Sequence, residues 1–496
     1  MSSRGLIKSM LVIGGAQVAN ILISVLRMKV LAVLLGPAGV GLLSIYTSLL
    51  GTVSEISGLG IHTSGIREIA SVRGEEPALS RVRVVLFAGN LLQGLIAMVL
   101  VWVWRAPLAR FLFGDTARAT EVGLVGVAVL FALLASSQTA LLQGMRRIGD
   151  LGRVTVLAAL AGTVAGLFAV WLRGEDALIW FVLIQPLTAI FVALYYTRKL
   201  PRPASARLRA SAIWQVWRPM AALGVVFMLG GLATSATLLV VRGMVTRYLG
   251  LESAGLFAAS WGITMQYIGF LLAAMAADYY PRLTEVIKDR PKASRLINDQ
   301  IQLGLALGGP VLLLLIGLAP WVMTLLYSPK FAPAADMLQW QTVGNIFKLA
   351  SWSIGFAFVA AAQSRVFLLT EIGWNLLFIT MLWVGLPLIG LQIAGPAFLL
   401  AYALYLAVIY ALARKLHGFR FEPLSLWLIA GHAALGFAVL ALAKSAPVPG
   451  GVVSALLAMA TGVIGLRVVL VKVGPGGKLT EVLAKSFEKI GWRIWK

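Results

Sequence analysis

The chain lacks cysteine entirely, and charged residues make up only 12% of its 496 residues. Without cysteine there can be no disulfide bond and no thiolate-based metal or redox site, although the compartment stays open. Acidic residues are especially scarce, with 19 Asp and Glu against 42 Lys and Arg, which gives a formal net charge of +23 at pH 7. The scarcity of charge and the excess of positive charge therefore need a common explanation.

Apolar residues supply that explanation. They make up 60% of the chain, and the mean hydropathy is +0.91. Length alone would suggest about three soluble domains, but this composition is typical of a polytopic membrane protein. The short basic segment Met1–Met10 runs into an apolar segment with no small-residue cleavage site, so it predicts a retained first helix rather than a signal peptide.

The predicted fold class is an all-α polytopic membrane protein with about fourteen transmembrane helices. A bilayer core needs about 20 apolar residues, and the loops between such runs are too short to hold a soluble domain. The predicted spans are Lys8–Leu34, Val40–Ile69, Val82–Trp104, Thr120–Gly144, Val154–Leu172, Leu178–Thr197, Met220–Val241, Gly255–Ala277, Ile301–Ala319, Met337–Ala362, Val366–Leu388, Ile393–Ala413, Leu424–Ala443 and Gly451–Val471.

Most Lys and Arg residues fall in alternate loops, for example between Arg198 and Arg209. Cytoplasmic loops carry such an excess, so this pattern predicts that both termini lie in the cytoplasm. The same rule accounts for the basic composition without a nucleic-acid partner.

The chain also contains an internal repeat. LGPAGVGLL (Leu35–Leu43) is similar to LGLESAGLF (Leu249–Phe257) at an offset of 214, and APLARFLFGD (Ala106–Asp115) is similar to APWVMTLLYS (Ala319–Ser328) at an offset of 213. LLQGMRR and AAQSRV match loosely, with Gln143 against Gln363 at an offset of 220. The unit holds six spans, and an even number predicts two lobes related by a pseudo-two-fold axis along the membrane normal, as in MATE-like folds.

This repeat predicts the domain organisation. We expect an N-lobe over 1–200, a basic cytoplasmic linker over 201–218, a C-lobe over 219–420, an accessory helix pair over 421–472 and a tail over 473–496. In the tail, apolar residues recur at helical spacing between basic ones, which predicts an amphipathic helix on the anionic inner leaflet. An ordinary soluble tail is the alternative.

Cations inside the spans are the first candidate site residues. Arg27 and Lys29 precede the turn predicted at LGPAGVG (Leu35–Gly41), and Arg242 and Arg247 approach the matching turn that begins at Leu249. Lys348 lies in the tenth span. A charge in the bilayer core costs about 2.5–3.5 kcal/mol and normally faces an interior or aqueous cavity. We predict a central cationic cavity between the lobes that binds an anionic head group, since Arg matches phosphate geometry. Pairing with carboxylates or helix carbonyls, purely for packing, is the alternative.

Three acidic residues are candidates for ion coupling. Glu55 and Glu371 lie in mid-span, and Asp278 lies at the inner end of the eighth span, where an ion-paired role is favoured. A buried carboxylate can take up and release H⁺ or Na⁺ during transport; the alternative is a permanent counter-ion. No other cofactor is expected.

Neutral polar side chains in the spans could hydrogen-bond sugar hydroxyls, but such side chains more often bridge helices. They are Gln93, Gln138, Gln143, Gln185, Asn345 and Asn375. His62 and His432 fit helix interfaces, and the glycines at Gly474–Gly477 lack the spacing of an ATP-binding loop.

The opening block KVLAVLLGPAGVGLL…GLGIHTSGIREIA resembles Wzx-type polysaccharide flippases of the multidrug/oligosaccharidyl-lipid/polysaccharide (MOP) exporter superfamily. The match is carried by the Gly-Pro-x-Gly-x-Gly turn, the exit motif Gly65–Ala70 and the Ala-Pro turns at Ala106 and Ala319. Many Wzx proteins have twelve spans, whereas fourteen are predicted here, as in the lipid II flippases of the same superfamily.

The resemblance implies a flippase, not an enzyme, in the bacterial inner membrane, and it adds Arg67 of the exit motif to the substrate-binding candidates. The implied substrate is undecaprenyl-pyrophosphate-linked oligosaccharide, moved to the periplasmic leaflet by alternating access. Contact with other polysaccharide-assembly proteins stays open. The alternatives are a lipid II flippase, a drug or small-solute antiporter with a more acidic cavity, and a membrane polymerase or ligase, which would need a larger catalytic outer loop.

Overall fold

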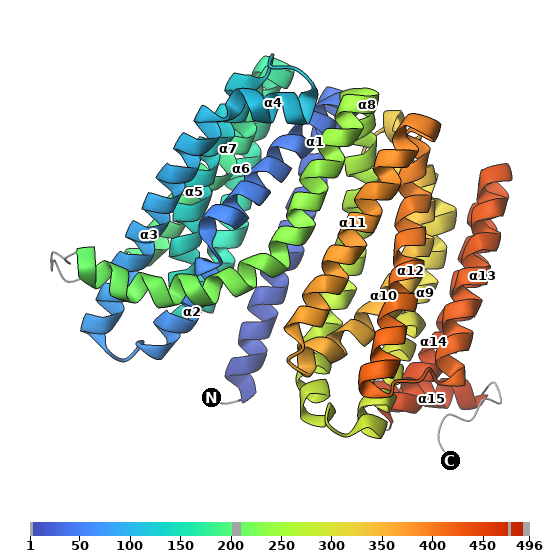
Figure 1. Ribbon diagram of the computed structural model, residues 1–496. Helices are drawn as coiled ribbons and strands as arrows, with labels where there is room; N and C mark the ends of the chain where they lie inside the picture. The colour runs from blue at the N-terminus through green and yellow to red at the C-terminus, as the bar shows by residue number, and fades with distance from the viewer. Residues whose placement is uncertain (1–2, 201–209, 475–477, 490–496) are drawn as a thin grey trace. The chain divides into compact units, whose positions relative to one another are not determined.

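The computed structural model describes residues 3–200, 210–474 and 478–489, and these residues form helices joined by short turns (Figure 1). The α-helices are α1 (Ser3–Gly58), α2 (Ile61–Ser71), α3 (Glu76–Val103), α4 (Arg105–Phe113), α5 (Ala119–Gly144), α6 (Ile148–Arg173), α7 (Leu178–Thr197), α8 (Ala210–Val286), α9 (Arg290–Leu326), α10 (Ala334–Ala360), α11 (Ser364–Ile389), α12 (Ala394–His417), α13 (Pro423–Ser445), α14 (Pro447–Val473) and α15 (Lys478–Lys489). Three short 3₁₀ helices are η1 (Gly174–Ala177), η2 (Pro329–Phe331) and η3 (Gly390–Ile393).

The long helices carry the predicted membrane spans. Within the described residues, 10 helical segments are long and apolar enough to cross a bilayer, and four of these are 39 to 54 residues long. Since about 20 residues suffice for one crossing, each of the four can hold two spans. The all-helical polytopic fold is thus confirmed.

Two of the longest helices contain one non-helical residue each, and both are glycines. Gly36 in α1 has φ 66° and ψ −165°, and Gly250 in α8 has φ 83° and ψ 174°. Few residues other than glycine adopt such angles, and after Gly36 the chain enters the next helical segment through Pro37, a residue that suits a first helical turn. The two glycines are 214 residues apart, which is the offset predicted from the sequence.

The repeat is visible in two further backbone features. Arg146 and Ala362 have φ values of 56° and 57° just after equivalent helices, and Gly174 and Gly390 have φ values of 62° and 64° as the first residues of η1 and η3. Both pairs are 216 residues apart.

One predicted pairing within the repeat is wrong. The amide of Arg147 donates to the Leu142 carbonyl and that of Gln363 donates to the Phe358 carbonyl, so the backbone matches Gln363 to Arg147 instead of Gln143. A shared glutamine in a loose match was a poor guide, because the turn is defined by backbone hydrogen bonds that several residue types can make.

The chain divides into two compact units. One comprises Met1–Ala258 with Leu326–Ser328, and the other comprises Ala259–Leu325 with Pro329–Lys496. The first half of α8 therefore belongs with the first unit, because it packs along α1. The lobe boundaries at 1–200 and 219–420 stay a prediction.

The predicted tail helix begins as expected at Lys478, but its apolar side is not simply turned to lipid. Ala484 and Phe487 of α15 are buried with Leu470 of α14, and Leu466 and Leu483 pack around them. The tail is thus attached to the accessory pair. The part of the predicted tail helix beyond Lys489 lies outside the described residues.

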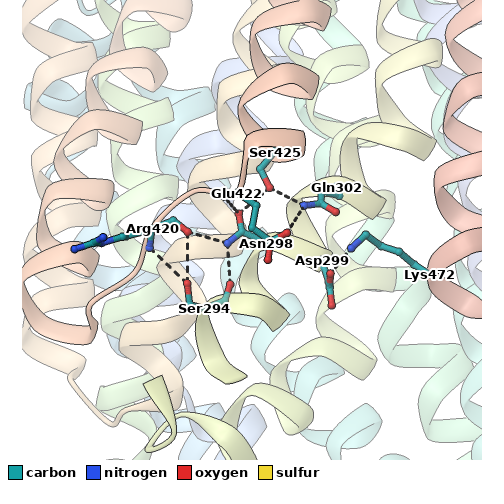
Figure 2. Close-up of polar contacts among 8 residues, drawn as sticks. All are labelled: Ser294, Asn298, Asp299, Gln302, Arg420, Glu422, Ser425 and Lys472. Carbon is teal, nitrogen blue, oxygen red and sulfur yellow. Dashed lines mark hydrogen bonds and ion pairs between the residues drawn. The ribbon is translucent and has the colours of Figure 1, made fainter. Parts of the chain in front are cut away.

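A buried polar network fixes the start of the accessory pair to α9 (Figure 2). Asn298 is 1% exposed, and its amide nitrogen donates to the carbonyls of Ser294 and Arg420, both at 2.9 Å. Its oxygen accepts from the Glu422 amide at 2.9 Å and the Ser425 hydroxyl at 2.7 Å. Beside it, Asp299 forms a half-exposed ion pair with Lys472 of α14.

This network makes a stability prediction. Asn298→Ala should lower the thermal unfolding temperature of the detergent-purified protein, because it leaves buried backbone groups unpaired at about 1–3 kcal/mol each. Asp299→Asn should change that temperature much less, because exposed ion pairs contribute about 0–1 kcal/mol. Equal effects of the two substitutions would contradict this assignment.

Candidate functional site

The central feature of the first unit is a seam, formed by residues 37–60 of α1 and the turn that follows it, against residues 224–255 of α8. Contacts pair Gly41 with Gly255 at one end and Gly60 with Gly224 at the other, so the segments run antiparallel. Counted along α1 from Gly41 to Gly60, at 1.5 Å per residue, the seam is about 28 Å long, close to the thickness of a bilayer core.

At the first end of the seam the two repeated turns contact each other. A Cβ on Gly41 would overlap the Leu251 carbonyl, and a Cβ on Gly255 would overlap the Pro37 carbonyl. The repeat relates Gly41 to Gly255 and Pro37 to Leu251, so one contact is made twice. Such close backbone approach in membranes requires residues without side chains.

Arg242 bridges the seam next to these turns. Its guanidinium donates to the Ser44 carbonyl at 2.7 Å and to the Ser48 hydroxyl, while its Nε has no partner among the described residues. This geometry matches the packing alternative for Arg242, because its terminal nitrogen is engaged by α1.

The middle of the seam is polar. The Thr52 hydroxyl donates to the Ser235 carbonyl at 3.1 Å. One turn further, the carboxylate of Glu55 lies against Gly231, where a Cβ would overlap its Oε1, and within hydrogen-bonding reach of the Ser235 hydroxyl. Glu55 is thus held at the seam as a half-buried acid without an ion pair to any described residue.

Glu55 also lines a polar cavity of about 290 Å³ inside the first unit. His62, Asn90 and Ser136 line it too, together with Met228 of α8. The His62 Nδ1 lies 3.0 Å from the Ser136 hydroxyl and 3.2 Å from the Ser136 carbonyl, so His62 is a satisfied interface residue, as expected, that also faces the cavity. A carboxylate and an imidazole on one membrane-embedded cavity can bind a cation or a proton.

Arg27 and Lys29 lie before the Gly36 turn, and both are half-buried. The Arg27 guanidinium lies 6.0 Å from the Phe181 ring centre and donates a long 3.4 Å hydrogen bond to Ser24, while its Nε has no described partner. Arg27 therefore points toward α7, whereas Arg242 points toward α1, so the repeat does not give them equivalent directions.

Lys348 is the most buried of the candidate cations. It is 6% exposed, with its Nζ 3.2 Å from the Met265 sulfur and 5.1 Å from the Tyr402 ring centre. Within the described residues it has no carboxylate at ion-pair distance. One turn earlier on α10, both amide atoms of the buried Asn345 also lack a described partner. The second unit thus holds an ammonium and an amide with unused hydrogen-bonding capacity.

Glu371 lies near Lys348 in the second unit and accepts a 2.6 Å hydrogen bond from Tyr405. The two tyrosines around this group, Tyr402 and Tyr405, were not singled out in the sequence. Their spacing of three residues on one predicted helix could have suggested a shared face.

The remaining candidates lie at the surface. Asp278 is exposed and forms an ion pair with Arg282 at 3.0 Å, in line with the role favoured for it. Arg67 and Arg247 are also exposed, and Arg247 packs beside Gly114 at the end of α4. Within the described part of the first unit, no hydrogen bond or ion pair joins Arg67 or Arg247 to Glu55.

The neutral polar candidates separate into two groups. Gln138 accepts a hydrogen bond from Thr197, and the Asn375 amide donates to the Glu371 carbonyl, so both make the expected packing bonds. Gln93 and Asn345 are buried, yet both of their side-chain polar atoms lack a described partner. A bound ligand could supply the missing hydrogen bonds to both of these amides.

The seam generates a prediction that the absence of cysteine makes easy to test. Thr52→Cys combined with Ser235→Cys should cross-link efficiently with a short bifunctional thiol reagent, because the Thr52 side chain contacts the Ser235 backbone. Adding Gly41→Ala should lower the yield several-fold, since the new methyl group overlaps Leu251. Gly230→Ala, where nothing lies within 4 Å, is the matched control. An undiminished yield with Gly41→Ala would show that the turn contact does not hold the seam.

Comparisons with known proteins agree on the class of molecule. Residues 6–287 match the family described as polysaccharide biosynthesis protein. The lipid III flippase of Escherichia coli (strain K12) is 26% identical over 389 residues, covering 77% of this chain and 91% of that protein.

Solved structures show the same fold. The lipid II flippase MurJ in an inward closed conformation has a TM-score of 0.66 at 12% identity, covering 92% of this chain and 98% of that one. An inward-facing multidrug resistance MATE transporter of the MOP superfamily has a TM-score of 0.62 at 16% identity, covering 84% and 95%. The relatives are flippases and transporters, not enzymes.

Proposed function

Because the chain belongs to the polysaccharide biosynthesis protein family, we propose that it is a flippase that moves a polyprenyl-pyrophosphate-linked oligosaccharide from the cytoplasmic to the periplasmic leaflet. The observation that carries the proposal is the match along 91% of the lipid III flippase. A relation over nearly the whole length of that protein supports a shared class of substrate, whereas the fold alone would not.

Alternating access needs a contact between repeated halves that can close and open. The glycine turns around Gly41 and Gly255 supply one, in which a backbone carbonyl of each turn lies against a glycine of the other. Such a contact brings the two backbones close together, and separating them breaks van der Waals contacts rather than hydrogen bonds between the two glycines and the facing carbonyls. We therefore assign the turns as the gate at one end of the path.

The substrate's pyrophosphate requires cationic or hydrogen-bonding groups inside the membrane. In the second unit the buried Lys348 ammonium donates to a thioether sulfur, and the amide of the neighbouring Asn345 has no described partner. In the first unit the half-buried Arg27 has an unpaired Nε. A buried ammonium is stabilised by an anion, so these groups favour an anionic head group. The polar cavity lined by Glu55 contains none of these three residues in its lining, and its carboxylate suits a coupling ion.

Reconstitution tests the proposal. Purified protein in phospholipid vesicles should move a fluorescent polyprenyl-pyrophosphate oligosaccharide between leaflets, measured as loss of protection from a membrane-impermeant quencher. Lipid II and a cationic drug, offered to the same vesicles, represent the two alternative functions within the superfamily. Transport of either one, without transport of the oligosaccharide lipid, would overturn the proposed substrate.

Lys348→Met tests the anion-contacting role. The substitution keeps most of the side-chain volume, so insertion and thermal stability should be nearly unchanged, while translocation should fall about tenfold or more from the loss of a charged hydrogen bond worth about 1.5–3 kcal/mol. Lys330→Met, at an exposed position, is the control. If both variants translocate normally, Lys348 does not contact the substrate.

Glu55→Gln tests ion coupling. In vesicles with an imposed H⁺ or Na⁺ gradient, the variant should lose the stimulation of translocation by the gradient and keep its basal rate. Glu75→Gln, at an exposed position between α2 and α3, should behave as the wild type. Normal stimulation of the Glu55 variant would exclude this carboxylate as the coupling group.

A further inference from the structure

An apolar groove of about 610 Å³ lies within the first unit, apart from the polar cavity. One face of α3 lines it through Leu92, Gln93, Ile96 and Leu100, and the first turns of α8 contribute Trp214 and Trp217. Its volume is within the range of about 300–1,000 Å³ that is typical of ligand sites. Neither the gate nor the coupling site uses it.

The end of α1 separates the groove from the polar cavity. Ile56 and Ser57 line the groove, while Glu55 and Gly58 line the cavity. Residues that alternate in this way along a helix face different directions. The groove is therefore an apolar compartment beside a polar one, divided by a single helix.

Gln93 is the one amide in the groove's lining, and it has no partner. The residue is 8% exposed, and neither its Nε2 nor its Oε1 has a hydrogen-bond partner among the described residues. Leaving both buried polar atoms unpaired is unfavourable. The occupant of the groove should therefore be mostly hydrocarbon, with hydrogen-bonding oxygen atoms at one point.

The groove opens toward the surface that spanning helices present to lipid. Leu92 is 61% exposed, Ile96 51% and Leu100 54%, all on α3. At the other end, Trp214 and Trp217 stack with their ring centres 5.2 Å apart, and Trp217 lies against Gly89. Tryptophan is enriched where hydrocarbon meets head groups, so the groove runs from the membrane interface into the core.

We propose that the groove binds the polyprenyl chain of the transported lipid at its junction with the pyrophosphate. Gln93 hydrogen-bonds the oxygen atoms that join chain and head group, and the first isoprene units lie along Ile96 and Leu100. From Gln93 to Leu100 the rise is about 10 Å. The inference rests on the proposed function, because that function supplies the lipid.

Photolabelling tests this site without requiring translocation. The full-length protein in nanodiscs is irradiated with a polyprenyl-pyrophosphate oligosaccharide that carries a diazirine in its first isoprene units, and the adducts are located by peptide mass spectrometry. We expect adducts within residues 88–100 and 213–217. Gln93→Leu should reduce them several-fold, and Gln143→Leu, at an exposed position on α5, should leave them unchanged.

Two further arms keep the test decisive. Ile96→Trp, which fills the groove from its lipid side, should also reduce labelling, and it replaces Gln93→Leu if that variant does not fold. A phospholipid with a diazirine in its acyl chain should label the groove much less. Equal labelling by that phospholipid, or adducts spread evenly over all lipid-facing helices, would overturn the inference.

The failure of this inference differs from the failure of the proposed function. Vesicles that translocate the oligosaccharide lipid without adducts in the groove would refute the groove alone. Adducts in the groove without translocation in vesicles would refute the flippase assignment and retain the lipid site.

Discussion

The first unit depends on one backbone contact, the approach of Gly41 and Gly255 to the carbonyls of Leu251 and Pro37. The contact brings two repeated turns together without side chains between them. From it, α1 and α8 extend side by side, so that Arg242 reaches Ser44 and Thr52 reaches Ser235. A methyl group at either glycine would separate the helices and leave these polar groups unpaired in a medium where that is costly.

Polar groups in the two units divide into those that packing uses and those that it does not. Arg242, Gln138 and Asn298 are held by hydrogen bonds to other segments of the chain, which is what a packing role requires. Asn345 and Gln93 are equally buried but have donors and acceptors without a described partner, and the buried Lys348 ammonium donates to the thioether sulfur of Met265 rather than to a carboxylate. In a membrane protein this second group is the better guide to a ligand, because it is retained against a free-energy cost.

The sequence was a good guide to the helices and the repeat, because bilayer thickness and hydropathy determine span length and because Gly36 and Gly250 require unusual backbone angles. It was a poor guide to side-chain direction. Arg27 and Arg242 occupy similar positions in the repeat, yet one points to α7 and the other to α1, since a one-residue difference in register rotates a side chain by about 100°. The sequence shows Gln93 as a polar residue within a span, but its lack of a described partner is a property of packing that no local pattern contains.

The central claim is that this protein moves a lipid-linked oligosaccharide across the membrane, and depletion in the native cell tests it most directly. After depletion, lipid-linked oligosaccharide should accumulate, and in spheroplasts it should resist an externally added glycosidase that cannot cross the membrane, because it remains on the cytoplasmic leaflet. Accumulated lipid that the external enzyme cleaves as fully as before depletion would contradict the account.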